Sequence, residues 1–141
     1  MKQLLLIALS IFAITTMCCS QKVNVPPAVT KAFNGKYPNA TNIKWGKESA
    51  KEYEAEFKLN NTAMSANFGL DGSWVETETT IRTSDLPTAV AAAITKKYPD
   101  AAFIIIEKIE KAGGKFFYEV VIKVNGIKKE MELRPNGSFV K

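Results

Sequence analysis

The acidic residues Glu52, Glu54 and Glu56 are the first group in this sequence whose type and spacing could do chemistry. Carboxylates on one face could hold a cation or act as a general acid and base. A spacing of two residues, however, is typical of one face of a β-strand. We therefore interpret these residues as a solvated strand face.

Two shorter motifs also suggest chemistry. Ser138 and Lys141 have the Ser-x-x-Lys spacing, which joins two side chains on a helix but puts them on opposite faces of a strand, and a strand is expected here. Asp71-Gly72 could begin a calcium loop, but the further acidic ligands of such a loop are missing. We interpret it as a turn.

The composition removes the commonest catalytic groups. The sequence has no histidine, and its two cysteines, Cys18 and Cys19, precede the segment that we expect to fold. No general base of the usual kind, zinc site or thiol nucleophile remains, and no nucleophile elbow or phosphate-binding glycine loop occurs. We therefore predict that the protein is not an enzyme and has no catalytic residues, metal or cofactor.

Large aromatic residues are the remaining candidates for a functional surface, because they bury much area for few lost rotamers. Five are candidate partner-binding residues: Trp45, Trp74, Tyr53, Tyr118 and Phe139. Each alternates with polar neighbours, so the alternative is that they fill a core between a helix and a sheet. Trp74 is the strongest candidate because it follows a turn.

The N-terminal residues indicate export. A basic start and the apolar run 4–13 are typical of a signal peptide, and the run is too short for a permanent membrane span. We expect residues 1–20 to be the signal peptide, with cleavage after Ser20. The alternative is a lipid anchor at Cys18 or Cys19. Both predict a periplasmic or secreted protein.

The rest of the chain contains an internal repeat. The similar segments are 24–29 with 85–90, 36–40 with 97–101, and 71–75 with 136–140. Extra residues in the second copy fit the glycine-rich segment 111–115, where an insertion costs little. We therefore divide the chain into repeat 1 at 21–82 and repeat 2 at 83–141, joined in one compact domain.

Each copy is predicted to be a helix followed by four strands. Asn24 and Asp85 suit the N-caps and Pro38 and Pro99 end the helices, since the residue before proline avoids helical geometry. Period-2 apolar patterns separated by Asn and Gly turns then predict strands.

The predicted fold class is therefore α+β: a tandem repeat of two αββββ units, each a helix packed on a four-stranded antiparallel sheet, with the two sheets continuous. A unit of this size would be marginal alone, so we expect the two units to share a core.

This order of motifs resembles the PepSY-like family of periplasmic proteins, related in fold to the β-lactamase inhibitor protein. The motifs are Val/Leu-Pro at the helix start, Lys-Tyr-Pro-Asn/Asp-Ala at its end, and Tyr-Glu and Asp/Asn-Gly-Ser in the strands. The resemblance covers both copies. It implies the tandem αββββ architecture, a place outside the cytoplasm, and a role in binding or inhibiting other proteins such as peptidases.

The leading hypothesis for function is an exported, non-enzymatic protein-binding module, with inhibition of an extracytoplasmic hydrolase or peptidase as one form of it. It predicts exposed aromatic and apolar groups on the sheet face away from the helices. The alternative is a periplasmic small-ligand-binding or envelope-sensing domain with a closed pocket between the units. The net charge of +5 is interspersed with acidic residues, so we expect no nucleic-acid partner.

Overall fold

The computed structural model of the chain describes residues 23–140. The predicted signal peptide and the two cysteines lie outside these residues. The elements follow in the order α1 (Pro27–Lys36), β1 (Thr41–Lys47), β2 (Glu52–Leu59), β3 (Thr62–Gly69), β4 (Trp74–Thr80), a 3-10 turn η1 (Thr83–Asp85), α2 (Thr88–Lys97), β5 (Ala102–Lys111), β6 (Lys115–Val124) and β7 (Ile127–Leu133). Neither helix in this part of the chain is long and apolar enough to cross a bilayer.

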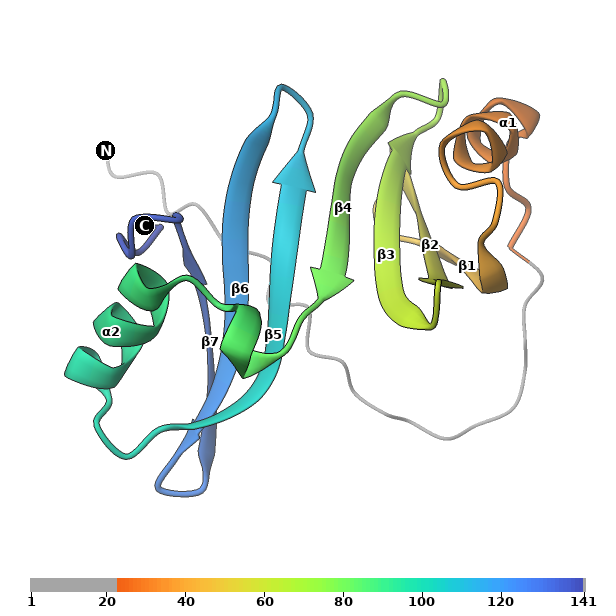
Figure 1. Cartoon of the computed structure of the whole chain (residues 1–141). Coiled ribbons are helices and arrows are strands. Elements are labelled where there is room, and N and C mark those ends of the chain that lie inside the picture. The colour runs from red at the N-terminus through yellow and green to blue at the C-terminus, as the bar shows by residue number, and fades with distance from the viewer. Residues whose placement is uncertain (1–22, 141) are drawn as a thin grey trace, which may run out of the picture.

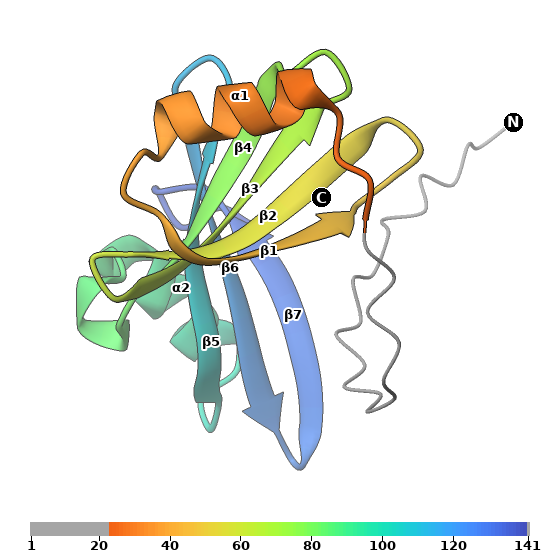
Figure 2. The ribbon, with the colours of Figure 1, turned by 90° about the vertical axis from the view of Figure 1, so that its right-hand side faces the viewer.

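The seven strands form one antiparallel sheet in the order of the sequence. Helix α1 lies beside β1 to β3 and α2 beside β5 to β7 (Figure 1). The register places the residues under both helices on the same face, so the other face is open. Figure 2 shows the strong twist of the sheet, in which β2 and β3 run steeply across the direction of β6 and β7.

The α+β class and the continuous antiparallel sheet agree with the sequence analysis, but the second half lacks a full fourth strand. Phe139, at the position of Trp74, forms a single antiparallel bridge with Leu133. The N–H of Val140 adds one hydrogen bond of 2.8 Å to the carbonyl of Glu132. Of the three described residues that follow Gly137, Phe139 alone forms a bridge, so no fourth strand is formed within residues 23–140.

The helices begin later than predicted. Pro26 and Pro87 occupy the N-cap positions, and neither helix has a side-chain cap. Proline has the fixed φ that an extended N-cap requires. Asp85 lies in η1 and accepts hydrogen bonds from the Arg82 guanidinium at 2.9 and 3.0 Å. The expected caps at Asn24 and Asp85 were therefore wrong.

The hydrophobic core consists of two separate clusters, one under each helix. Val29 and Phe33 of α1 anchor the first cluster on β2 and β3, and Val90 and Ile94 of α2 anchor the second on β5 to β7. Between the clusters the facing residues are polar, with Thr77 opposite Glu110 and Thr79 opposite Lys108. The expected shared core was wrong, because the halves share a sheet instead.

The join between the halves is the pairing of β4 with β5. Residues 76–80 of β4 pair with 107–111 of β5. Strands β5 and β6 have ten residues each, against seven and eight in β1 and β2. The glycine-rich segment 111–115 is the tip of this longer hairpin, so the predicted insertion extends the strand that joins the halves.

Candidate functional site

A groove of about 1310 Å³ runs across the open face of the sheet and is lined by residues from every strand. Its lining contains nine of the fourteen acidic residues of the chain and four lysines. The acidic ones are Glu48, Glu54, Glu56, Glu76, Glu78, Glu107, Glu119, Glu130 and Glu132. A chain with a net charge of +5 thus gathers most of its carboxylates on one face.

Strand alternation and register put these carboxylates in line. Glu107 on β5 lies directly opposite Glu119 on β6, and Glu119 lies directly opposite Glu132 on β7. Three like charges therefore follow one another across three strands, an arrangement that destabilises a sheet. Ile109, two residues from Glu107 on β5, lines the groove and is 2% exposed, so the floor of the groove is partly apolar.

Burial and mutual repulsion change how the groove titrates. Burial, followed by the carboxylates of Glu107 and Glu76, raises the pKa of Glu78 to about 7. Burial, followed by the carboxylates of Glu130 and Glu78, raises the pKa of Glu119 to about 7. Each of these side chains therefore exchanges a proton near neutral pH.

The same two causes act less strongly on their neighbours. Burial, followed by the carboxylates of Glu48 and Glu56, raises the pKa of Glu54. Burial also raises the pKa of Glu107, although the hydroxyl of Thr80 opposes the change. The groove thus concentrates negative charge although burial and mutual repulsion disfavour the ionised carboxylates.

A few polar contacts relieve this charge. The Lys111 ammonium lies 3.5 Å from a carboxylate oxygen of Glu76 and 3.8 Å from one of Glu132. The Ser65 hydroxyl donates to Glu78 at 3.1 Å, and the Asn67 amide nitrogen donates to Glu76 at 3.3 Å. The amide oxygen of Asn67 has no hydrogen-bond partner although the residue is only 8% exposed.

The groove can bind donors but is not arranged as a metal centre. Within residues 23–140 no three acidic, histidine or cysteine side chains come together in a way that could hold a metal ion. The carboxylates are instead spread along the strands. Such a surface offers many hydrogen-bond acceptors to an extended, positively charged group.

The five aromatic residues predicted as partner contacts lie on the helix-covered face instead. Tyr53 and Tyr118 belong to the two cores and are each 9% exposed, so they have little surface to offer. Trp45 packs edge-on against Phe33 at 5.2 Å between ring centroids. The residues divide into a group of three on the first core and a pair on the second.

Trp74 and Phe139 are half-buried and occupy equivalent positions beside the helix ends. The Lys36 ammonium lies 3.8 Å from the centroid of the Trp74 ring, and the Lys97 ammonium lies 4.4 Å from that of Phe139. The Trp74 indole also donates to the Thr77 hydroxyl at 2.9 Å. Both rings therefore already have a cationic neighbour within the chain.

The groove residues were not recognised as a site from the sequence. A signal was present, since Glu alternates at 54 and 56, at 76 and 78, and at 130 and 132, each pair within one strand. The expected aromatic and apolar open face is present only in part. The exposed side chains of Ile43 and Ile105 line the groove, but carboxylates outnumber them there, and the five aromatic candidates lie on the helix-covered face. Alternation shows which residues of one strand share a face, but not that five separate strands align their acidic residues on the same face of the sheet.

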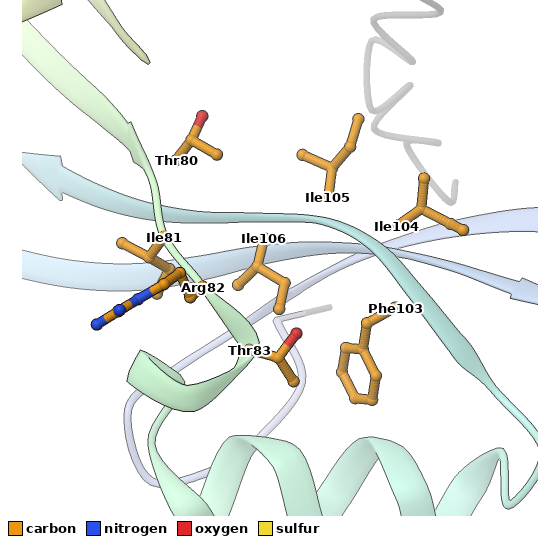
Figure 3. A pocket seen from close by; sticks show the side chains of 8 residues that line it. All are labelled: Thr80, Ile81, Arg82, Thr83, Phe103, Ile104, Ile105 and Ile106. Atoms are coloured by element: carbon orange, nitrogen blue, oxygen red, sulfur yellow. The ribbon is translucent and has the colours of Figure 1, made fainter. Parts of the chain in front are cut away.

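A second, smaller hollow of about 340 Å³ lies at the join of the halves, lined by residues 80–83 and 103–106. Figure 3 shows Ile104 and Ile105 on one side of the β5 ribbon and Phe103 and Ile106 on the side of α2. A register shift between Phe103 and Ile105 explains why two neighbouring residues share a side. The hollow lies along the edge of β5 at residues 103–106, next to the part of β5 that pairs with β4. It is an open hollow and not the closed pocket of the alternative hypothesis.

The fold and the groove define a class of proteins: α+β scaffolds whose single antiparallel sheet carries its helices on one face and leaves the other open. The chain belongs to the family described as "Putative beta-lactamase-inhibitor-like, PepSY-like", whose model matches residues 20–62 and again residues 51–141. The predicted family is thereby confirmed. No match was found among curated proteins.

Solved structures from Bacteroides share the fold. One of the "putative periplasmic proteins" of Bacteroides eggerthii is 21% identical, with a TM-score of 0.76 over 83% of this chain and 86% of that chain. A DUF2874 family protein of Bacteroides ovatus is 22% identical, with a TM-score of 0.73 over 82% and 85%. A "BLIP-like protein" of Bacteroides fragilis is 24% identical, with a TM-score of 0.67 over 81% and 82%. At these identities the likeness shows the fold.

Proposed function

We propose that this protein is an exported, non-enzymatic module that binds another protein with the open face of its sheet. The observation that carries the proposal is the groove of about 1310 Å³ that crosses all seven strands. It is larger than a typical small-molecule site, and it extends over both halves. Both helices cover the opposite face, so within residues 23–140 neither helix blocks a partner from the groove.

A location of the protein outside the cytoplasm supports the proposal. The related B. eggerthii protein is described as periplasmic and the B. fragilis protein as BLIP-like, and residues 1–20 have the pattern of a signal peptide. Inhibition of an extracytoplasmic hydrolase or peptidase is the finer form of the function that we propose. A module that binds the surface of a hydrolase around its active site would inhibit that enzyme by blocking the access of substrate.

The two halves of the chain, 21–82 and 83–141, are proposed to be copies of one αββββ unit. In support, Gly72 and Gly137 take positive φ angles of 86° and 83° and each lies against a helix carbonyl, that of Ala28 or Ala89. The second copy has kept its helix and three strands. Its longer hairpin provides the join to the first copy.

The half-buried aromatic residues Trp45, Trp74 and Phe139 remain a second proposed contact surface, on the helix side. Trp74 has the strongest support because it lies at the start of β4, beside the exposed turn at Asp71. Its ring would exchange the Lys36 ammonium for a group of the partner. This surface and the groove lie on opposite faces, so they are tested by separate variants.

The experiment is capture from a periplasmic extract with the chain lacking residues 1–20 as bait. Ala63→Trp places a bulky, uncharged side chain in the groove, because Ala63 is exposed and lines it. Ala92→Trp, on the exposed side of α2, is the matched control. Loss of one captured protein with Ala63→Trp alone supports the groove, whereas its loss with Trp74→Ala alone supports the aromatic surface. Capture that no variant reduces contradicts the proposal.

A further inference from the structure

The acidic groove has an electrostatic character opposite to that of the whole chain. Nine carboxylates and four ammonium groups line it, whereas the complete sequence has 19 basic and 14 acidic residues. A charge distribution of this kind attracts cations to one face and repels them elsewhere. It therefore selects a partner that places its positive charges in the groove.

Repulsion between neighbouring carboxylates makes the groove electrostatically unfavourable when no cation is bound. Glu107, Glu119 and Glu132 face one another directly across neighbouring strands, and like charges in such positions are destabilising. Sequences that depart from local stability rules commonly do so at functional sites. Positive charges placed between these carboxylates would remove the repulsion.

Asn67 gives an independent indication of what the groove lacks. This residue lines the groove and is 8% exposed, and its amide nitrogen is used by Glu76. Its amide oxygen is buried without a partner. An unsatisfied buried acceptor is costly and needs an N–H or O–H donor. Ionised glutamates cannot supply this donor, whereas a ligand that carries N–H groups would.

Lys111 shows how an ammonium group is accommodated in the groove. Its nitrogen lies 3.5 Å from a carboxylate oxygen of Glu76 on β4 and 3.8 Å from one of Glu132 on β7. One cation thus connects carboxylates from both halves of the chain. Glu54, Glu56, Glu78, Glu107, Glu119 and Glu130 make no ion pair within the described residues, so further cations have places to bind.

We propose that the groove binds a segment of its partner that is rich in lysine and arginine, with the carboxylates of β2, β4, β5, β6 and β7 pairing its cations and the Asn67 amide oxygen accepting one of its N–H groups. This inference rests on the proposed function and specifies the partner's chemistry. A polypeptide is the occupant because the acceptors are distributed along a groove that crosses seven strands. They do not converge on one ion.

The test uses three capped twelve-residue peptides in which threonine alternates with lysine, glutamine or glutamate. Binding to the chain lacking residues 1–20 is measured by titration calorimetry at pH 8. We expect binding of the lysine peptide only, weakened at least about tenfold when the salt concentration rises from about 50 to about 300 mM. Because the chain is basic overall, non-specific attraction would favour the glutamate peptide instead.

Variants then locate the site. The double variant Glu107→Gln and Glu119→Gln is expected to weaken binding about tenfold, and Asn67→Ala about fivefold. Glu110→Gln is the matched control, since Glu110 lies on the same strand but faces the other side of the sheet and is exposed. It should change binding less than about twofold. A thermal melt of each variant shows that it is folded.

Equal binding of the lysine and glutamine peptides, or equal losses for the groove variants and Glu110→Gln, would overturn the inference. Spermidine that bound as tightly as the lysine peptide would overturn the assignment of a polypeptide. These outcomes differ from failure of the proposed function. A partner that is captured by the chain and lost with Ala63→Trp, but is unaffected by Glu107→Gln and Glu119→Gln, leaves the function intact and refutes the cationic segment.

Discussion

Glu107 and Glu119 lie directly opposite each other on neighbouring strands, and Glu132 continues the row on the far side of Glu119. Cross-strand neighbours of like charge repel each other. Here burial adds to the repulsion, and together with Glu130 and Glu78 it raises the pKa of Glu119 to about 7. The groove is thus the part of the fold whose stability depends most directly on pH.

Glu119→Gln is expected to raise the free energy of unfolding at pH 8 by about 1 to 2 kcal/mol, since water in the open groove screens part of the repulsion. The pKa of Glu119 rises from 4.5 to about 7 on folding, so the folded state binds the extra proton. The stabilisation that protonated Glu119 gives the folded state is fully present below pH 4.5 and is lost as the pH rises to about 7. Urea unfolding at pH 5 and pH 8 measures the effect.

Two comparisons check that prediction. The difference in unfolding free energy between pH 5 and pH 8 should shrink in Glu119→Gln but remain in Glu110→Gln, which lies on the other face of the sheet. A native protein that is more stable at pH 8 than at pH 5, with no change in Glu119→Gln, would contradict the role of this carboxyl.

Gly72→Ala and Gly137→Ala are each expected to cost about 3 kcal/mol. Both glycines have positive φ angles, and an added Cβ would stand 2.7 Å from the carbonyl oxygen of Ala28 at Gly72, and closer still to that of Ala89 at Gly137. Gly126→Ala should cost only about 1 kcal/mol, because its φ is 82° but nothing lies within 4 Å of the added atom. Equal losses at the three positions, measured by urea unfolding, would rule out the close approach as the cause.

Tyr37→Phe is expected to lower the free energy of unfolding by about 1 kcal/mol. The Tyr37 hydroxyl forms a buried hydrogen bond with that of Thr77, which also accepts the Trp74 indole N–H. Thr77→Val should cost more, about 2 kcal/mol, because it removes the hydrogen-bond partner of both Tyr37 and Trp74. Tyr98→Phe is the control, since Tyr98 has the equivalent position after α2 but no side-chain hydrogen bond to the described residues. Similar losses for both tyrosines would contradict the assignment.

Val29→Ala and Val90→Ala are each expected to cost about 2 to 3 kcal/mol, because both side chains are fully buried. They belong to different clusters, so the double variant should lose the sum of the two within about 0.5 kcal/mol. Val29→Ala combined with Phe33→Leu, both in the first cluster, should deviate more. A large coupling between Val29 and Val90 would show that the halves share a core after all.

Local signals in the sequence were sufficient for most elements. In both helices the tyrosine before proline, Tyr37 or Tyr98, is the C-cap residue, because proline restricts the residue that precedes it. Asn60 and Asn125 each have a φ of 50° at the predicted hairpin turns. The helix starts were missed because proline and the classical capping residues compete for the same position, and the sequence does not show which one is used.

The sequence by itself determined the helix-then-strands order, the family and the faces on which residues alternate, since each of these depends on neighbours within a few positions. Only the tertiary structure decided that β4 pairs with β5, that the cores stay separate, and that Glu107, Glu119 and Glu132 form one row. Register and strand order depend on contacts between residues far apart in the chain. A period of two residues carries no information about those contacts.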